Sequence, residues 1–277
     1  RQVGAETCGV YVQAGQWRVD VCEEQALSEN RLGRGMLEFY LMVLRRVCSR
    51  LRVPLALGSH KLGLLLNAAE DAGRLQVMLQ SWKQWEVLEE ELEKAECFAV
   101  IVCLDDGKFP RDCVLAVVLP AGEEDVTLKE ASALKVCVVD ALRRRGLAER
   151  LAKVRGGVLR ASWRSDLGEV EVGEGPGMVA AVAQERVLAC VGVLLTMVAE
   201  RAGVECGAAA RVRSEGFARG VQKALSEGFA IMRAAVSAGE SRDVLALEEL
   251  RAPGGCREFL EMLLKWGEEA RWSKAAE

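Results

Sequence analysis

Apolar residues in this chain form two kinds of segment, and that mixture limits the folds it can adopt. Within residues 28–50, apolar side chains recur at three- and four-residue steps, the period of an amphipathic helix. Residues 97–104 (CFAVIVCL) and 113–119 (CVLAVVL) are short Val-rich runs instead, compatible with a hairpin or with two buried helices. We therefore expect helices and strands in mixed order, an α+β fold.

The remaining segments divide in the same way. Strand-like alternation marks residues 8–22, with a turn at Ala14-Gly15, and residues 154–173, while 52–57 has the composition of a short strand. Helical patterns mark residues 60–73 and 127–145, each followed or closed by a glycine, and the tail after residue 207. Residues 179–201 are apolar and are expected to be buried.

The charge balance limits the partners that the protein can have. A net charge of -4 over 277 residues does not favour wrapping of nucleic acid by the whole surface. RNA contacts would then come from local basic clusters, of which the chain has two candidates: Arg143, Arg144 and Arg145, and Arg211, Arg213 and Arg219. Solvated helix faces are the more common role of such clusters.

Cysteine and histidine usage argues against several kinds of site. The ten cysteines include no CxxC pair and lie mostly in apolar runs, which favours a reducing compartment over a disulfide framework. The single histidine, His60, would have to serve in any zinc site or as the base of any Ser-His-Asp triad, so neither is expected. We expect no metal and no cofactor, and a structural role for His60 near a helix cap.

The ends of the chain and its most apolar window suggest a compartment. The sequence begins at Arg1, as a processed or partial chain would, and removal of an organelle-targeting peptide fits this. Residues 187–198 are apolar but too short to span a bilayer. The expectation is a soluble protein without membrane contact, mitochondrial or otherwise cytoplasmic.

A glycine-rich stretch at 169–184, EVEVGEGPGMVAAVAQ, has the order of a nucleotide or S-adenosylmethionine loop, with a strand, glycines and a helix-forming segment. Such a site also needs an acidic residue at the end of the next strand to hold the ribose. No acid lies between Arg186 and Glu200. The glycines are therefore expected to serve the fold.

Five segments, taken in order, resemble the catalytic core of histidyl-tRNA synthetase and its paralogue, the regulatory subunit of ATP phosphoribosyltransferase. They are residues 16–47, residues 51–73, VRGGVLRAS at 154–162, GEGPGMV at 173–179 and ACVGVLLTMVAE at 189–200. The resemblance implies a class II synthetase-like core over residues 1–202, an antiparallel sheet flanked by helices with an insertion at about 86–130. Residues 203–277 would form a small helical or α/β C-terminal region, a remnant of the anticodon-binding domain.

Departures from that family carry the functional expectation. In the family, two arginines bind the ATP phosphates. The matching positions here are Gly9 or Val12, and a position near Ala199, so the cations that adenylate formation requires are absent. The weak ligand-binding remnants are Arg155, Gly156, Gly173, Gly177 and Gly192. We therefore expect no catalytic residues and no enzyme activity. The expected role is a pseudoenzyme, structural or RNA-associated, within an assembly such as an organellar ribosome.

In that role the partners are protein subunits of a larger complex and rRNA, and the core could mediate a dimer. Two alternatives stay open. One is a histidine-sensing regulatory subunit of ATP phosphoribosyltransferase. The other is a pentatricopeptide-like helical-repeat RNA-binding protein, because glycines close several helical segments and two of the gaps between them are near 35 residues.

Overall fold

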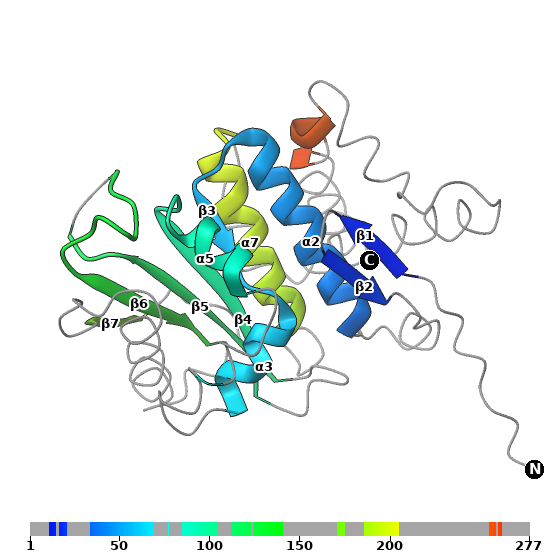
Figure 1. The fold of residues 1–277 in the computed structure, drawn as a ribbon, viewed down its shortest axis with the longest axis horizontal. Coiled ribbons are helices and arrows are strands. Elements are labelled where there is room, and N and C mark those ends of the chain that lie inside the picture. The colour runs from blue at the N-terminus through cyan, green and yellow to red at the C-terminus, as the bar shows by residue number, and fades with distance from the viewer. Residues whose placement is uncertain are drawn as a thin grey trace, which may run out of the picture.

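A computed structural model describes ten stretches of the chain: residues 11–14, 17–20, 34–68, 77, 85–104, 112–122, 125–140, 171–174, 186–204, and 255–261 without 259. They form a five-stranded sheet, a separate two-stranded sheet and several helices (Figure 1). The coarse expectation of an α+β fold is confirmed.

The larger sheet is mixed, with strand order β3-β4-β5-β6-β7. Its centre is antiparallel: β4 (Cys97–Cys103), β5 (Cys113–Pro120) and β6 (Leu134–Val139) run in alternating directions. The outer strands β3 (Leu55–Leu57) and β7 (Glu171–Glu174) are parallel to β4 and β6. The expected antiparallel sheet is thus corrected to a mixed one, because each outer strand joins the centre through a crossover rather than a hairpin.

The first two strands form a sheet of their own. β1 (Tyr11–Ala14) pairs with β2 (Trp17–Asp20) in antiparallel register, with Ala14 opposite Trp17. This agrees with the turn expected at Ala14-Gly15. Figure 1 shows the pair beside α2, away from the five-stranded sheet.

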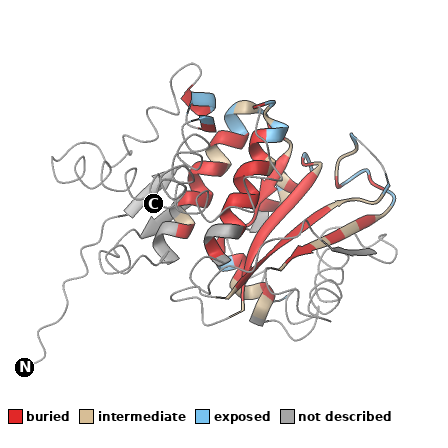
Figure 2. Ribbon diagram, turned by 180° about the vertical axis from the view of Figure 1, so that it is seen from behind, coloured by how far each residue is buried: buried red, intermediate tan, exposed pale blue. Residues whose placement is uncertain are grey.

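Helices cover both faces of the larger sheet and enclose two apolar clusters. The first cluster lies under α2 (Arg34–Leu51) and α7 (Arg186–Arg201), where buried side chains recur at helical spacing along each helix. The second cluster lies on the other face and includes buried residues of α5 (Trp85–Leu92) and α3 (His60–Ala68). Figure 2 shows buried residues filling α2, α7 and the central strands. Cys256 and Leu260 belong to the first cluster.

The two Val-rich runs are strands, which settles the choice that periodicity left open. Alternate residues of β4 enter opposite clusters, with Ile101 in the first and Val100 in the second. A strand buried on both faces is apolar throughout, so its sequence carries no period-two signal.

The helix expected over residues 127–145 is wrong, because residues 134–139 form β6. Leu134, Val136 and Val138 are buried in the second cluster while Lys135 and Cys137 are only half-buried, which is strand alternation. Pairing with the buried strand β5 outweighs the helical propensity of the flanking residues.

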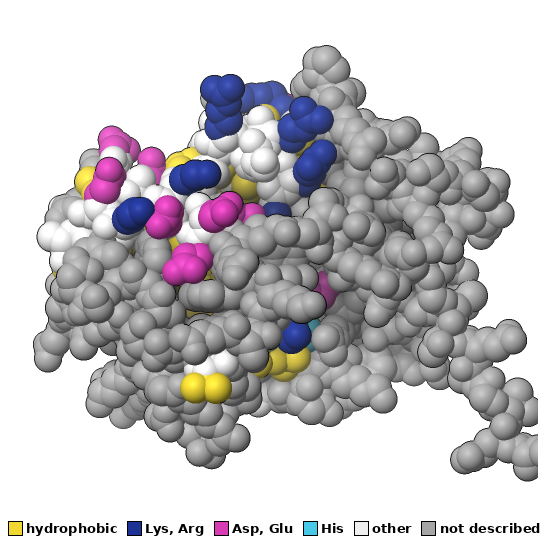
Figure 3. All heavy atoms as spheres, viewed as in Figure 1, with side chains coloured by type: hydrophobic (Ala, Val, Ile, Leu, Met, Phe, Trp, Pro, Cys, Tyr) yellow, Lys and Arg dark blue, Asp and Glu magenta, His cyan; other side chains and the backbone are white. Residues whose placement is uncertain are grey.

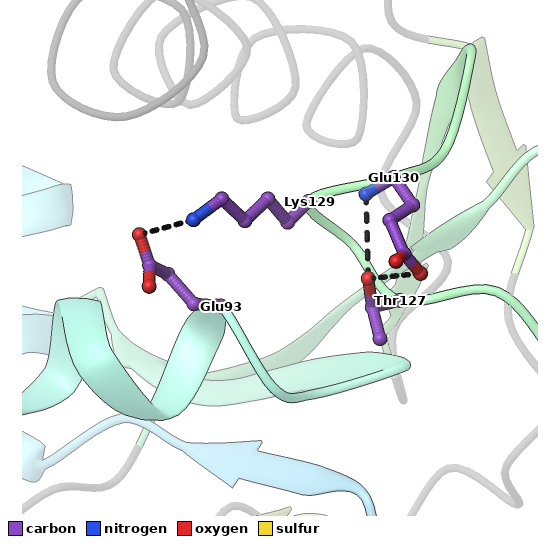
Figure 4. A network of polar contacts seen from close by, with 4 residues as sticks. All are labelled: Glu93, Thr127, Lys129 and Glu130. Atoms are coloured by element: carbon purple, nitrogen blue, oxygen red, sulfur yellow. Dashed lines mark hydrogen bonds and ion pairs between the residues drawn. The ribbon is translucent and has the colours of Figure 1, made fainter.

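The segment before β6 is held mainly by buried contacts. Leu128 is fully buried, and its backbone nitrogen donates to the carbonyl oxygen of Ala95 at 2.7 Å. Figure 4 shows the polar contacts beside it, an ion pair between Lys129 and Glu93 at 2.8 Å and a hydrogen bond between Thr127 and Glu130. Both are exposed and therefore contribute little.

No helix within the described part of the chain is long and apolar enough to cross a membrane.

Candidate thiol–imidazole site

Strand directions bring six chemically active residues to one end of the larger sheet. The C-terminal end of β4, the N-terminal end of β5 and the C-terminal end of β6 coincide there, since Cys103 pairs with Cys113 and Leu115 with Val139. We call these residues the strand-end cluster. Four lie at or beside the strand ends, one comes from α3 and one from α7: Cys103, Asp112, Cys113, Asp140, His60 and Cys190.

His60 reaches the cluster because a defined helix start follows β3. Ser59 is the N-cap of α3: its Oγ accepts from the backbone nitrogen of Leu62 at 3.2 Å. Glu38 on α2 accepts from the backbone nitrogen of Lys61 at 3.0 Å, which ties the same turn to the neighbouring helix. His60 is the first residue of α3 and is fully buried. The expected position beside a helix cap is confirmed.

Glycine allows α3 to lie directly against β4. A Cβ added to Gly63 would stand 2.0 Å from the carbonyl oxygen of Ile101, and one added to Gly58 would stand 2.7 Å from Val100. Real Cβ atoms do not come so close to other heavy atoms, so a side chain at Gly63 would push α3 away from β4, and one at Gly58 would displace the side chain of Val100. Gly63 therefore sets how closely α3, which begins at His60, approaches β4.

The imidazole and two thiols of the cluster are in contact. Nδ1 of His60 lies 3.4 Å from Sγ of Cys103, and Sγ of Cys113 lies 3.4 Å from the same sulfur. All three side chains are almost completely buried. A neutral imidazole at this distance can accept the thiol proton, which gives the thiolate that acts as a nucleophile.

Cys190 brings a third thiol from α7, in a different electrostatic environment. Its pKa is raised well above the ordinary value, first by burial and then by Cys103, Asp140 and Asp112. Anionic neighbours disfavour a further negative charge, so this thiol stays protonated. Within the cluster, Cys103 is the thiol with an imidazole contact, and it is the better candidate nucleophile.

Two of the site residues that the synthetase resemblance predicts, Gly173 and Gly192, lie in the described part of the chain, and neither belongs to the strand-end cluster. Gly173 lies in β7 opposite Cys137 of β6. Gly192 lies within α7, and its carbonyl oxygen accepts from Thr196 Oγ1 at 3.0 Å. The other expected residues lie outside the described part of the chain: Arg143, Arg144, Arg145, Arg155, Gly156, Gly177, Arg211, Arg213 and Arg219.

Sequence reasoning missed the pairing of His60 with Cys103, which are 43 residues apart. One signal was available: His60 follows a short strand and Cys103 ends a Val-rich run, so parallel pairing of those two strands would bring both residues to the same end of a sheet. Metal binding receives no support from the cluster, because the described residues contain no group of three or more ligands arranged to hold an ion.

No protein-family model matches the chain, and no curated protein matches it. One solved structure with a similar arrangement is described as the crystal structure of the de-sumoylating protease. The match has a TM-score of 0.49 and 8% sequence identity, and covers 94% of this chain and 92% of that chain.

The expectation that the chain is not an enzyme is not kept, since the structure that it matches is described as a protease. The absence of arginines at the positions that the synthetase resemblance predicts argues only against adenylate formation. At this TM-score and identity, the likeness assigns neither an activity nor a substrate to the chain.

Proposed function

We propose that the protein is a thiol-dependent acyl-transfer enzyme in which Cys103 is the nucleophile and His60 the base. The observation that carries this proposal is the contact of 3.4 Å between Nδ1 of His60 and Sγ of Cys103. A nucleophile and a base within hydrogen-bonding reach are the minimal apparatus for covalent catalysis at an acyl carbon.

The reaction follows from that geometry. His60 takes the proton of Cys103, and the thiolate attacks the carbonyl carbon of an ester, thioester or amide. The leaving group departs with the proton from the imidazolium, and water then hydrolyses the thioester with His60 again as base. A base in this role contributes roughly 10²–10⁴-fold to the rate.

Burial sets a condition on this chemistry. Cys103 and His60 are both 0% exposed, so a substrate reaches the sulfur only when the structure opens locally. The fraction of time for which the Cys103 sulfur is accessible limits the rate of acylation. Small activated esters should therefore react faster than larger substrates.

The direct test is acylation by p-nitrophenyl acetate, followed by release of p-nitrophenolate and by peptide mapping in a mass spectrometer. We expect acetylation of Cys103, its loss in Cys103→Ser, and a decrease of at least about 100-fold in rate in His60→Gln. Circular dichroism and thermal unfolding of each variant separate loss of chemistry from loss of fold.

Cys97→Ala is the matched control. Cys97 lies on the same strand and in the same apolar cluster as Cys103, and its pKa is raised to about 12, chiefly by burial. This variant should be acetylated at Cys103 as fast as the unmodified protein. Equal acetylation of Cys97 and Cys103, or a folded His60→Gln variant with an unchanged rate, would overturn the proposal.

A second candidate function keeps the expectation of an RNA-associated component with a synthetase-like core. A group of cationic side chains at the C-terminal ends of α2 and α7 supports it. Figure 3 shows Lys and Arg side chains gathered at this end of the molecule. We call it the arginine patch, and it consists of Arg46, Arg50, Arg52 and Arg257.

Three of these arginines are related through the segment that contains Cys256. Arg50 and Arg46 both lower the pKa of Cys256, which burial raises overall, and Arg257 donates to the carbonyl oxygen of Ala202 at 3.2 Å. Arg52 is exposed immediately after α2. Two exposed carboxylates, Glu200 and Glu258, lie on the same segments and weaken the field. Such a patch suits a phosphate backbone, and rRNA of an organellar ribosome is the partner in this proposal.

Fluorescence anisotropy with a single-stranded RNA oligonucleotide tests the second candidate. The double variant Arg50→Ala/Arg52→Ala should weaken binding and reduce its salt dependence, because fewer counterions are released. Lys61→Ala/Lys94→Ala removes the same charge from exposed positions elsewhere on the described surface and should not. Equal loss in both double variants, or no binding at all, would remove this candidate.

A further inference from the structure

We propose that Cys103 and Cys113 form a reversible disulfide, which makes the strand-end cluster a redox-sensitive modification site. The effect on activity rests on the proposed acyl-transfer function, whereas the disulfide itself does not. The two residues are directly opposite each other on β4 and β5, and their sulfur atoms lie 3.4 Å apart.

The register of the two strands favours the bond. The backbone nitrogen of Leu104 donates to the carbonyl oxygen of Asp112 at 2.8 Å, so these two neighbours form a hydrogen-bonded pair. Cys103 and Cys113 therefore occupy a non-hydrogen-bonded pair, in which opposed Cα atoms approach to about 4.5 Å. That separation lies within the range of disulfides, about 4.4–6.8 Å, so side-chain rotation can bring the sulfurs to bonding distance without moving the strands.

His60 supplies the activating base for the first step. It accepts the Cys103 proton, and the thiolate attacks one sulfur of a low-molecular-weight disulfide such as oxidised glutathione. One molecule of small thiol leaves, and a mixed disulfide forms on Cys103. Cys113 then loses its proton and attacks the Cys103 sulfur, which expels the second small thiol. Two protein thiols are oxidised by two electrons in total, and one small disulfide is reduced to two thiols.

Other thiol pairs are less suitable partners. Cys190 interacts electrostatically with Cys103, but Asp140 and Asp112 disfavour the thiolate that it would need to attack a mixed disulfide. Cys137 also interacts electrostatically with Cys97, but the two lie on β6 and β4 with β5 between them. Cys103 and Cys113, in contrast, are in direct sulfur–sulfur contact across two paired strands.

A disulfide at this position would remove the Cys103 thiolate. Under the proposed function, the oxidised protein is inactive towards acyl substrates and reduction restores it. Both sulfurs are almost completely buried, so oxidation proceeds at the rate of local opening. The site would therefore respond to sustained oxidising conditions rather than to brief ones.

The test equilibrates the full chain in glutathione buffers of increasing oxidised fraction, quenches with acid, alkylates free thiols and maps peptides without reduction. The expected product is a peptide pair linked through Cys103 and Cys113. In Cys113→Ala, a glutathione adduct should accumulate on Cys103 instead, and in Cys190→Ala the linked pair should still form. His60→Gln should slow formation of the mixed disulfide.

Linkage of Cys103 to Cys190, or recovery of Cys103 and Cys113 as free thiols while other cysteines of the chain oxidise, would overturn the inference. Acetylation by p-nitrophenyl acetate distinguishes this failure from failure of the proposed function. If the disulfide forms but Cys103 is not acetylated, only the acyl-transfer proposal is contradicted. If Cys103 is acetylated in both the unmodified protein and Cys113→Ala but no disulfide forms, only the redox inference is contradicted.

Discussion

Gly63 and Ile101 are in backbone contact: a Cβ on Gly63 would stand 2.0 Å from the carbonyl oxygen of Ile101. The contact holds α3 against β4, and the first residue of that helix is His60. The geometry of the strand-end cluster therefore depends on the absence of one methyl group at Gly63, four residues along the chain from the N-cap Ser59.

Gly63→Ala should reduce the free energy of unfolding by about 1–3 kcal/mol, because the added methyl group meets backbone that cannot rotate away. It should also separate His60 from Cys103 and so slow acylation of Cys103 in the folded variant. Urea unfolding and the acylation assay measure the two effects. Lys61→Ala, on the exposed side of the same helix, should stay within about 0.5 kcal/mol of the unmodified protein. A Gly63→Ala variant as stable as the control would contradict the contact.

Tyr40→Phe should stabilise the protein by about 1 kcal/mol. The hydroxyl of Tyr40 is buried in the first cluster and has no hydrogen-bond partner within the described part of the chain, so its removal relieves an unmet polar group. Burial, and to a smaller extent Cys48, raises the pKa of this side chain, in keeping with an apolar surrounding. Thermal unfolding checks the sign. Tyr40→Ala, which also removes the ring, should instead cost about 3–5 kcal/mol.

Stability should decline on the alkaline side. Burial raises the pKa of Cys48 and of Cys97 from 9.0 to about 12. A folded-state pKa above the unfolded one means that the stabilising contribution is complete below pH 9 and is lost as the pH rises towards 12. Each thiol should reduce the free energy of unfolding by up to about 1.4 kcal/mol per pH unit in that window.

Urea unfolding at a series of pH values measures this slope, and Cys48→Ala/Cys97→Ala should make it shallower. An unchanged slope in the double variant would show that these thiols are accessible in the folded state.

Leu128 should matter far more to stability than its neighbour Lys129. Leu128→Ala should cost about 2–5 kcal/mol, because the fully buried side chain anchors the segment before β6. Lys129→Ala removes an exposed ion pair with Glu93 and should cost less than about 1 kcal/mol. Chemical denaturation of both variants compares them directly. The reverse order would mean that the ion pair, rather than apolar burial, holds this segment.

Several elements could be predicted from local pattern. The spacing of Leu37, Tyr40, Leu41 and Leu44 predicts α2, and the predicted strand before His60 is β3. Prediction failed at β6, where buried and half-buried residues alternate but the strand lies between helix-forming residues. It also left β4 and β5 undecided, because strands buried on both faces carry no alternation.

The candidate site could not be predicted in the same way. His60 and Cys103 each looked structural: one is a single histidine near a helix cap, the other a cysteine in an apolar run. Their contact depends on the order of strands in the sheet and on the closeness that Gly63 permits, and neither is a local property.

Sequence alone determined where apolar faces form and which segments can be amphipathic helices, since these follow from side-chain spacing along a single element. Only the tertiary structure decided which strands are neighbours, which ends of them coincide, and therefore which thiol faces the imidazole. The physical reason is that a hydrogen-bonded ladder can pair any two compatible strands, and the choice among pairings is made by packing of the whole core.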